Sequence, residues 1–301
     1  MSASKRSSHT PTLDEFEWRG ILWNNYTTLE VLRRAVCEFR YRPSDICVCT
    51  FPRCGTTLTQ EIVWQLVHRD VIQQGAKFAA IDERFPFLEF NYGWGTSGPV
   101  RWGIDELEAA PQDRQRLIKT HCPYSLIGNA LDSANPRIIA VLRNPKDCCN
   151  SLYHFYKGLE MYGPWPGDWP EFVDMFLNGR TMCGDYFQVT SEWWQQRDKP
   201  NVLVLKYEDI VSSPQHSICR IADHLGIQPS TEQLACVMHN CSFESMSSND
   251  NVNTTFGTGF RFLRKGLIGD WKASFTEEQS ERFERAAQER LAAIGLEFRY
   301  E

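Results

Sequence analysis

Short apolar runs alternate with amphipathic stretches along most of this chain. Apolar runs at 46–49, 117–118, 137–142 and 202–205 predict buried strands. Between them, residues 59–72 and 217–225 carry apolar side chains at helical spacing, and a further helical stretch begins near Asp147, a candidate N-terminal cap. Strands that alternate with helices indicate a mostly parallel sheet covered on both faces. We therefore expect an α/β fold, with a mostly parallel central sheet flanked by helices in a single domain.

Polar and glycine-rich stretches divide the rest of the chain. Residues 1–15 predict a disordered N-terminal lead, so that the folded domain covers residues 16–301. Segments 85–103, 158–170 and 247–260 predict long loops over the ends of the strands. We find no signal-peptide core and no apolar stretch near the ~20 residues of a membrane span. These patterns predict a cytoplasmic protein without a membrane partner.

Charge and cysteine content narrow the classes of partner. The chain of 301 residues has a net charge of −6, from 32 basic and 38 acidic residues, which argues against a nucleic-acid binder with its basic surface. Its 11 cysteines are odd in number, and neither Cys47-x-Cys49 nor Cys148-Cys149 has the spacing of a zinc pair. Reduced thiols and no metal are therefore expected.

The segment at 50–57, T-F-P-R-C-G-T-T, joins a predicted strand to a predicted helix. A turn through glycine into a helix N-terminus presents free backbone N–H groups and a positive dipole end to an anion. The ATP loop pattern G-x-x-x-x-G-K-S/T would require glycine at position 50 and lysine at position 56, where this chain has Thr50 and Thr56. The cation precedes the glycine instead, at Arg53. The loop thus predicts a phosphate or sulfate ester rather than the β and γ phosphates of ATP.

Three more segments carry candidate chemistry. Leu117-Ile118-Lys119-Thr120-His121 places a lysine and a histidine at a strand end, and R-N-P-K-D at 143–147 follows another strand, with Ser151 one helical turn further on. Near the C-terminus stands R-K-G-L-I-G-D-W-K at 264–272. Together with P-R-C-G-T-T and with residues 192–210, these segments resemble the cytosolic sulfotransferases, in the same order, from about residue 40 to the end. Members of that family use 3′-phosphoadenosine 5′-phosphosulfate (PAPS) as sulfuryl donor.

The resemblance implies a PAPS site with three parts and the product adenosine 3′,5′-bisphosphate (PAP). The P-loop-like segment for the 5′-phosphosulfate would comprise Arg53, Cys54, Gly55, Thr56, Thr57 and Leu58. The 3′-phosphate would bind Arg143, Ser151, Arg264, Lys265 and Gly266. The adenine and ribose would contact Tyr207, Cys241, Ser242, Phe243, Met246 and Leu263.

The same resemblance implies the catalytic groups. His121 would be the general base that takes the proton of the acceptor, because a neutral imidazole is available near pH 7. Lys119 and Arg53, with Ser151, would neutralise charge on the transferred sulfuryl group and the leaving phosphate. No metal is needed.

The acceptor site is less defined. Phe87, Phe90 and Phe155 match positions that line the acceptor pocket of the family, although a core position is an equally good interpretation of each. With Lys119, Thr120 and His121 they would bind a small lipophilic or aromatic alcohol, phenol or amine. The sequence does not choose among these acceptors.

Several positions depart from the family pattern. Arg53 stands where most relatives have lysine, Cys241 replaces a common threonine, and Leu58 replaces a tryptophan that stacks on adenine, which predicts weaker donor binding. The family's dimerisation element K-x-x-x-T-V-x-x-x-E is matched at Lys272, Thr276 and Glu281, but its valine is Glu277 here. A charge in a small apolar contact is costly, so we expect a monomer or a weak homodimer.

Three alternatives remain open. A nucleotide kinase would also use a strand–loop–helix phosphate site, but would need ATP and magnesium. A carrier or sensor would bind the nucleotide without turnover. An enzyme whose sulfated alcohol eliminates would give a net dehydration.

Overall fold

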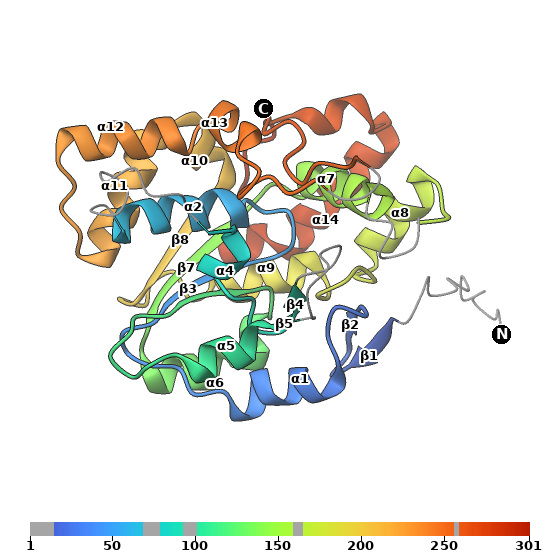
Figure 1. Cartoon of the computed structure of the whole chain (residues 1–301). Helices are drawn as coiled ribbons and strands as arrows, with labels where there is room; N and C mark the ends of the chain where they lie inside the picture. The colour runs from blue at the N-terminus through green and yellow to red at the C-terminus, as the bar shows by residue number, and fades with distance from the viewer. Residues whose placement is uncertain (1–14, 69–78, 93–100, 159–164, 256–258) are drawn as a thin grey trace.

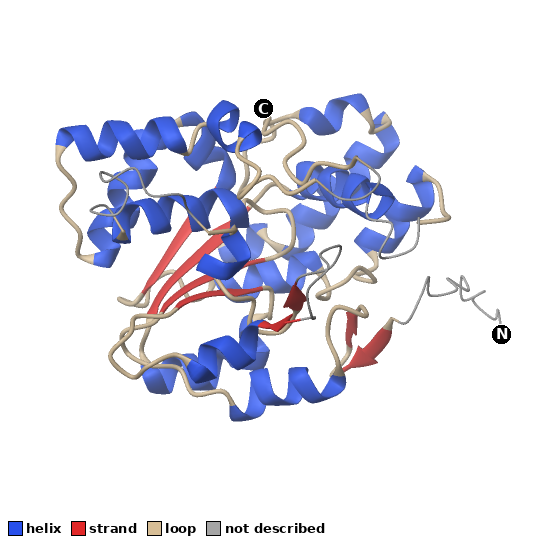
Figure 2. Ribbon diagram, in the orientation of Figure 1, coloured by secondary structure: helices blue, strands red, loops and turns tan. Residues whose placement is uncertain are grey.

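The computed structural model describes residues 15–68, 79–92, 101–158, 165–255 and 259–301. All but the last residue of the predicted N-terminal lead, and parts of the three predicted long loops, lie outside this part of the chain. Figures 1 and 2 show a central sheet with helices on both sides of it. The prediction of a single α/β domain with a parallel central sheet is confirmed.

The central sheet consists of four parallel strands in the order β6 (Leu117–Thr120), β3 (Ile46–Thr50), β7 (Arg137–Leu142) and β8 (Val202–Lys206). All four coincide with predicted apolar runs. Two short antiparallel pairs lie apart from this sheet: β1 (Phe16–Trp18) with β2 (Ile21–Trp23), and β4 (Asn91–Tyr92) with β5 (Arg101–Trp102). Because all strands of the central sheet run the same way, their carboxyl ends share one edge, and the segments that follow them meet there.

The central sheet is buried on both faces. In β3, Ile46 and Val48 pack with residues of α2 (Thr56–Val67) and α11 (Pro214–Leu225) on one side. Cys47 and Cys49 pack on the other side with residues of α6 (Tyr124–Ala134) and α14 (Glu277–Arg290). Successive side chains of a strand point to opposite faces, so two covered faces explain why the strands read as continuous apolar runs. The two thiols pack as small hydrophobes.

The remaining helices complete these two layers and the edge of the sheet. They are α1 (Leu29–Arg33), the π-helical turn η1 (Arg34–Glu38), α4 (Ile81–Arg84), α5 (Gly103–Ala109), α7 (Pro145–Gly158), α8 (Trp169–Leu177), α9 (Tyr186–Trp194), α10 (Tyr207–Ser212), α12 (Thr231–Asn240), α13 (Phe243–Ser248), and the 3₁₀ turns η3 (Asp270–Ala273) and η4 (Ala292–Ile294). The helix predicted from residue 59 begins at Thr56, so it starts directly after the glycine of the loop.

The prediction that Asp147 caps its helix is wrong. Helix α7 begins two residues earlier, at Pro145, and the side chain of Asn144 accepts the N–H of Asp147 at 2.8 Å. Proline is favourable at a first helical position because its missing N–H is not needed there. The carboxylate of Asp147 is therefore free to bind another segment.

Candidate functional site

The loop between β3 and α2 has the backbone geometry of an anion site. Arg53 and Gly55 have φ angles of 68° and 97°, both in the left-handed region. Glycine is required at position 55 for a second reason, because an added Cβ would lie 2.6 Å from the ring of Tyr207. In the described chain, no side chain caps the first turn of α2. Its N–H groups are thus available to a bound anion.

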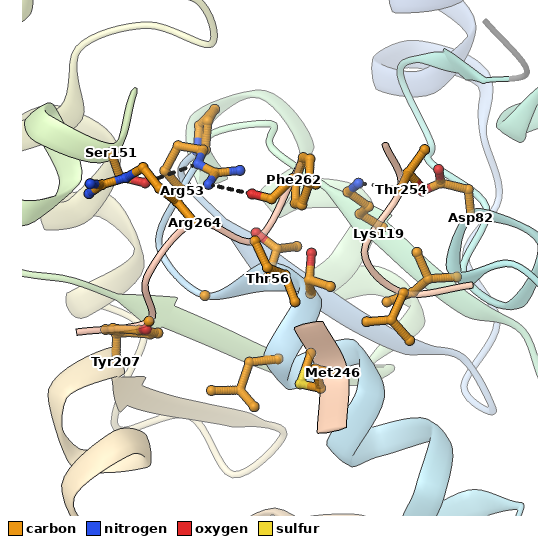
Figure 3. A pocket seen from close by; sticks show the side chains of 18 of the residues that line it. Arg53, Thr56, Asp82, Lys119, Ser151, Tyr207, Met246, Thr254, Phe262 and Arg264 are labelled. Atoms are coloured by element: carbon orange, nitrogen blue, oxygen red, sulfur yellow. Dashed lines mark hydrogen bonds and ion pairs between the residues drawn. The ribbon is translucent and has the colours of Figure 1, made fainter. Parts of the chain in front are cut away.

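The guanidinium of Arg53 is tied to two other parts of the chain. Its Nε donates to Ser151 Oγ at 3.1 Å, and its Nη2 donates to the backbone oxygen of Phe262 at 3.0 Å, as Figure 3 shows. It also lies over the rings of Phe155 and Phe262, 5.1 and 4.6 Å from their centroids. Burial and the charges of Arg143 and Arg264 lower the pKa of Arg53 to about 10, so it stays charged at neutral pH.

Two further arginines lie near this loop with unused N–H groups. Arg143 donates to the backbone oxygen of Arg53 at 3.0 Å and lies over the Tyr207 ring at 4.3 Å. Arg264 comes from the C-terminal segment and pairs with Asp270. Among the described residues, the buried Nε atoms of Arg143 and Arg264 have no hydrogen-bond partner. A buried polar group without a partner costs about 1–3 kcal/mol, so the two N–H groups indicate that an anion completes the site.

The C-terminal segment is held against α7 by Asp147. One carboxylate oxygen accepts the N–H of Gly269 at 2.8 Å, and the other accepts the N–H of Trp271 at 3.0 Å. Between these residues, Asp270 pairs with Lys265 at 2.6 Å. These contacts hold the R-K-G-x-x-G-D-W-K run beside the start of α7, although the two segments are far apart in the sequence.

A buried carboxylate also fixes the segment after β7. Oε1 of Glu208, at the start of α10, accepts the backbone N–H of Asn144 at 2.8 Å and its side-chain amide at 2.9 Å. Burial raises the pKa of Glu208, because the neutral form needs less solvation. Glu208 thereby sets the position of the residue next to Arg143.

His121 follows β6 directly and has a defined tautomer. Its Nδ1 lies 2.7 Å from the backbone oxygen of Thr50, and a carbonyl oxygen only accepts, so Nδ1 carries the proton and Nε2 carries the lone pair. Burial and the charges of Lys119 and Arg53 lower the pKa of His121 to about 3. The imidazole is therefore neutral at physiological pH.

Lys119 lies beside His121 on the same side of β6. Its Nζ lies 4.1 Å from the centroid of the Phe87 ring and 3.7 Å from a carboxylate oxygen of Asp82. The Phe87 ring also meets the His121 ring edge-on at 4.9 Å. One aromatic side chain thus contacts both polar groups at the end of this strand.

The loop, the three arginines, Ser151, Lys119 and His121 line one cavity of about 1030 Å³, part of which Figure 3 shows. Its cationic half is formed by Arg53, Arg143, Ser151, Arg264 and Lys265, and continues past Thr56, Thr57, Leu58, Tyr207, Cys241, Ser242, Phe243, Met246, Leu263 and Gly266. Its aromatic half is formed by Phe87, Phe90 and Phe155, with Tyr26, Met182 and Cys183. Lys119 and His121 also line this cavity.

Two predicted site residues do not line the cavity. Thr120 is fully buried, and its hydroxyl accepts the N–H of Cys122 at 3.0 Å. It lies between Lys119 and His121, so the alternation of a strand turns it to the opposite side. The side chain of Cys54 is also fully buried, and its Sγ lies 3.7 Å from that of Cys148 beneath the loop.

Other residues of the cavity were not predicted from the sequence. Phe262 precedes the basic pair of the C-terminal motif and supplies both a ring and a carbonyl oxygen to Arg53. Met182 and Cys183 enter the aromatic half from the segment before α9. A methionine and a cysteine outside any motif give no signal in a single sequence.

Two features are absent from the described part of the chain. It contains no group of three His, Cys, Asp or Glu side chains placed to hold a metal ion. None of its helices has the length and apolar character needed to cross a membrane.

Comparisons with known proteins agree with this geometry. The family model described as "Sulfotransferase domain" matches residues 43–295. The chain is 36% identical over 276 residues to sulfotransferase 1A1 of Rattus norvegicus, covering 88% of this chain and 90% of that protein. It is 33% identical over 268 residues to sulfotransferase 1C2 of Homo sapiens, covering 87% and 88%.

A solved structure shares the fold at similar length. The crystal structure of retinol dehydratase in complex with androsterone and the inactive cofactor PAP superposes with a TM-score of 0.78 at 30% identity. The match covers 89% of this chain and 87% of that one. The family model and the two curated relatives each span most of the chain, and the chain therefore belongs to the sulfotransferase family.

Proposed function

We propose that this protein transfers a sulfuryl group from PAPS to the hydroxyl or amine of a small lipophilic acceptor, with His121 as general base. The observation that carries the proposal is the joint cavity. A cationic half suits the nucleotide, an aromatic half suits an apolar acceptor, and a neutral imidazole and an ammonium group line the same space. Group transfer of this kind depends on positioning and charge rather than on covalent chemistry of the protein.

The cationic half fits a nucleotide with two anionic groups. The N–H groups at the start of α2 suit a phosphosulfate, and the buried, unused Nε atoms of Arg143 and Arg264 suit a separate phosphate. When bound, PAPS supplies the activated sulfuryl group. Lys265 and Gly266 belong to the same site, whereas Leu58, Tyr207, Phe243 and Met246 offer apolar surface to the adenine.

His121 is arranged to accept a proton at Nε2. Proton transfer from the acceptor hydroxyl gives an imidazolium whose Nδ1–H is already bonded to Thr50. In the ligand-free protein the pKa of about 3 makes this imidazole a weak base. Anionic PAPS offsets the positive charges of Lys119 and Arg53, which raises that pKa and strengthens the base.

Lys119 and Arg53 stabilise charge that moves during transfer. The oxygen that leaves the sulfuryl group gains negative charge, and preorganised cations stabilise it at low solvent exposure. Ser151 holds the Arg53 guanidinium in place through its hydroxyl. Because Arg53 remains charged at neutral pH, we assign it an electrostatic role and not that of a proton donor.

The aromatic half favours a planar or lipophilic acceptor. Phe87, Phe90 and Phe155 all line the cavity, although each is also largely buried. Androsterone is bound in the retinol dehydratase structure, and a second crystal structure of that enzyme contains retinol and PAP. Both ligands are apolar alcohols, which supports the same class for this protein.

We also propose that the protein is a monomer or a weak homodimer in solution. The matched positions of the dimerisation element lie around the start of α14, where Thr276 caps the helix by accepting the N–H of Gln279. Glu277, in place of an apolar residue, follows directly and is exposed. Light scattering across a concentration series tests this, and a stable dimer would contradict it.

The function is tested by product mass. Purified protein is incubated with PAPS and a panel of phenols, steroid alcohols, polyene alcohols and amines. A product that has gained a sulfuryl group, lost in His121→Ala while PAP binding is retained, is the expected result. A dehydrated alcohol would support sulfation followed by elimination, and transfer at the wild-type rate by His121→Ala would exclude the proposed base. Magnesium-dependent phosphorylation by ATP would support a kinase.

A further inference from the structure

A strand-like segment beside β6 joins the aromatic wall of the cavity to the end of that strand. The N–H of Lys119 donates to the oxygen of Pro86 at 3.2 Å, and the N–H of Leu88 donates to the oxygen of Lys119 at 2.9 Å. Phe87 accordingly pairs with Lys119 as in a parallel ladder. The segment that carries the Phe87 ring is thus hydrogen-bonded to the strand that leads to His121.

The next residue, Glu89, extends this ladder with a side chain. Its Oε1 accepts the backbone N–H of His121 at 2.5 Å, and the residue is fully buried. Strand β6 has ended at Thr120, so the N–H of His121 is bonded by this carboxylate instead of by a strand. A buried N–H requires such an acceptor. Glu89 therefore fixes the peptide that carries the imidazole.

Besides the His121 N–H, the side chain of Thr120 also hydrogen-bonds to the carboxyl group of Glu89. The groups that face it are Tyr41 after η1, Cys49 on β3, Lys119, Thr120, the His121 N–H and Cys122 at the end of β6, and Cys183 before α9. Lys119 is the one cation among them, and burial raises the pKa of Glu89 to about 7. Within the described chain, its Oε2 has no hydrogen-bond partner.

A carboxylate in this place is costly for stability. An apolar side chain of similar volume would avoid the desolvation of the charge, as replacements of buried ionic groups show. An N–H bonded to a carboxylate, however, is held more strongly than one bonded to a neutral oxygen. In return for this cost, the Glu89 carboxylate fixes the position of the His121 peptide.

We propose that Glu89 is a positioning residue for sulfuryl transfer, whose carboxylate holds the general base His121 and the acceptor wall at Phe87 in one geometry. The inference rests on the proposed function of His121. The inference also predicts that kcat depends on pH, because the ionised Glu89 carboxylate holds the His121 peptide more tightly than the neutral acid does. Part of kcat is therefore lost as the pH falls through about 7, the pKa of Glu89.

Two substitutions separate the reach of this side chain from its charge. Glu89→Gln keeps an oxygen at the same distance but removes the charge, and Glu89→Asp keeps the charge but withdraws the oxygen by one methylene. Glu208→Asp makes the same shortening in the cationic half, where Glu208 holds Asn144. The readouts are kcat and KM with one accepted substrate across neutral pH, PAP affinity by calorimetry, and hydrogen exchange of the peptide that contains the His121 amide.

We expect Glu89→Asp to lower kcat about 100-fold, the effect of a displacement of about 1 Å at a reacting group. PAP affinity should stay unchanged, and the His121 amide should exchange faster. Glu89→Gln should restore most of kcat and lose the pH effect near 7. Glu208→Asp should instead weaken PAP binding.

Two results would overturn the inference. One is a wild-type kcat and pH profile in Glu89→Asp. The other is a loss of kcat, PAP affinity and thermal stability together in both Glu89 variants, which is the sign of a general packing role. If the wild-type protein transfers nothing to any acceptor, the proposed function fails. The role of Glu89 is tested separately by hydrogen exchange: an unchanged exchange rate of the His121 amide in Glu89→Asp would refute the inference that Glu89 positions His121.

Discussion

The two halves of the cavity are built by different means. The cationic half is made of backbone N–H groups and guanidinium groups at the ends of β3 and β7, held by buried carboxylates such as Asp147 and Glu208. The aromatic half is made of single side chains from separate segments, including Phe87, Phe155 and Met182. Fixed charge and backbone geometry specify one ligand, whereas shape and apolar area admit many. The cavity is thus expected to be far more specific for the donor than for the acceptor.

The largest effect is expected at His121, between the halves. His121→Ala should lower kcat by about 10²- to 10⁴-fold, the usual contribution of a general base. PAP affinity should change little, because the imidazole bonds to Thr50 and is not among the groups assigned to the nucleotide. Steady-state kinetics and calorimetry on the same preparation measure both values. Weak PAP binding by the variant would mean that His121 belongs to the cationic half.

The cationic half is tested most strongly at Arg143. Arg143→Ala removes one member of a buried charge contact, which costs about 2–5 kcal/mol in binding. PAP affinity should therefore fall by about 30-fold or more. Arg143→Lys should recover only part of it, because an ammonium group lacks the bidentate geometry of guanidinium. Equal affinity of all three proteins for PAP would show that the 3′-phosphate lies elsewhere.

The two halves also differ in the glycine that each requires. At Gly103, the first residue of α5, an added Cβ would lie 2.0 Å from the backbone oxygen of Phe87. Gly103→Ala should raise the acceptor KM and lower Tm by several degrees, while PAP binding remains. Gly55→Ala should show the reverse pattern, with PAP affinity lost first. The same response in both variants would contradict the separation of the halves.

Binding of PAP to the cationic half should raise the pKa of the His121 imidazole. PAP adds negative charge near Lys119 and Arg53, so the pKa of His121 should rise from about 3. The proposed general base acts when it is neutral, so activity should be lost as the pH falls through the raised value. NMR titration of the histidine with and without PAP measures the shift. A pKa that stays near 3 would contradict the electrostatic coupling.

The smallest effect is expected at Leu58, which lines the cationic half. Leu58→Trp adds an aromatic surface for the adenine. Stacking contributes about 1–3 kcal/mol per base, and leucine already provides part of the contact. We expect PAP affinity to rise by about fivefold, which calorimetry resolves. Unchanged affinity would place the adenine away from position 58.

The residues that line the cationic half could be singled out from the sequence because they lie in short contiguous motifs. The glycine of the loop, the arginine after β7 and the basic pair near the C-terminus each follow a recognisable local pattern. The parallel sheet then brings these segments to one edge. Alternation along β6 would also have excluded Thr120 from the cavity, since Lys119 and His121 face the other way.

The remaining features depend on contacts that no local pattern reveals. Arg53 and the Phe262 carbonyl are 209 residues apart in the sequence. Asp147 has the sequence context of a helix cap, but Asn144 takes that place and leaves Asp147 for the C-terminal segment. Glu89 lies in a segment predicted to be a loop, where a carboxylate suggests an exposed residue. Only its burial beside the His121 N–H shows otherwise.

The most direct test of the central claim is calorimetric titration of the purified protein with PAP and, separately, with ATP. The cationic half predicts a single PAP site per chain and little or no binding of ATP, because the loop lacks the glycine and lysine that hold its β and γ phosphates. Selective binding of PAP would support the donor site independently of the unknown acceptor. Binding of ATP without PAP, or of neither nucleotide, would contradict the account.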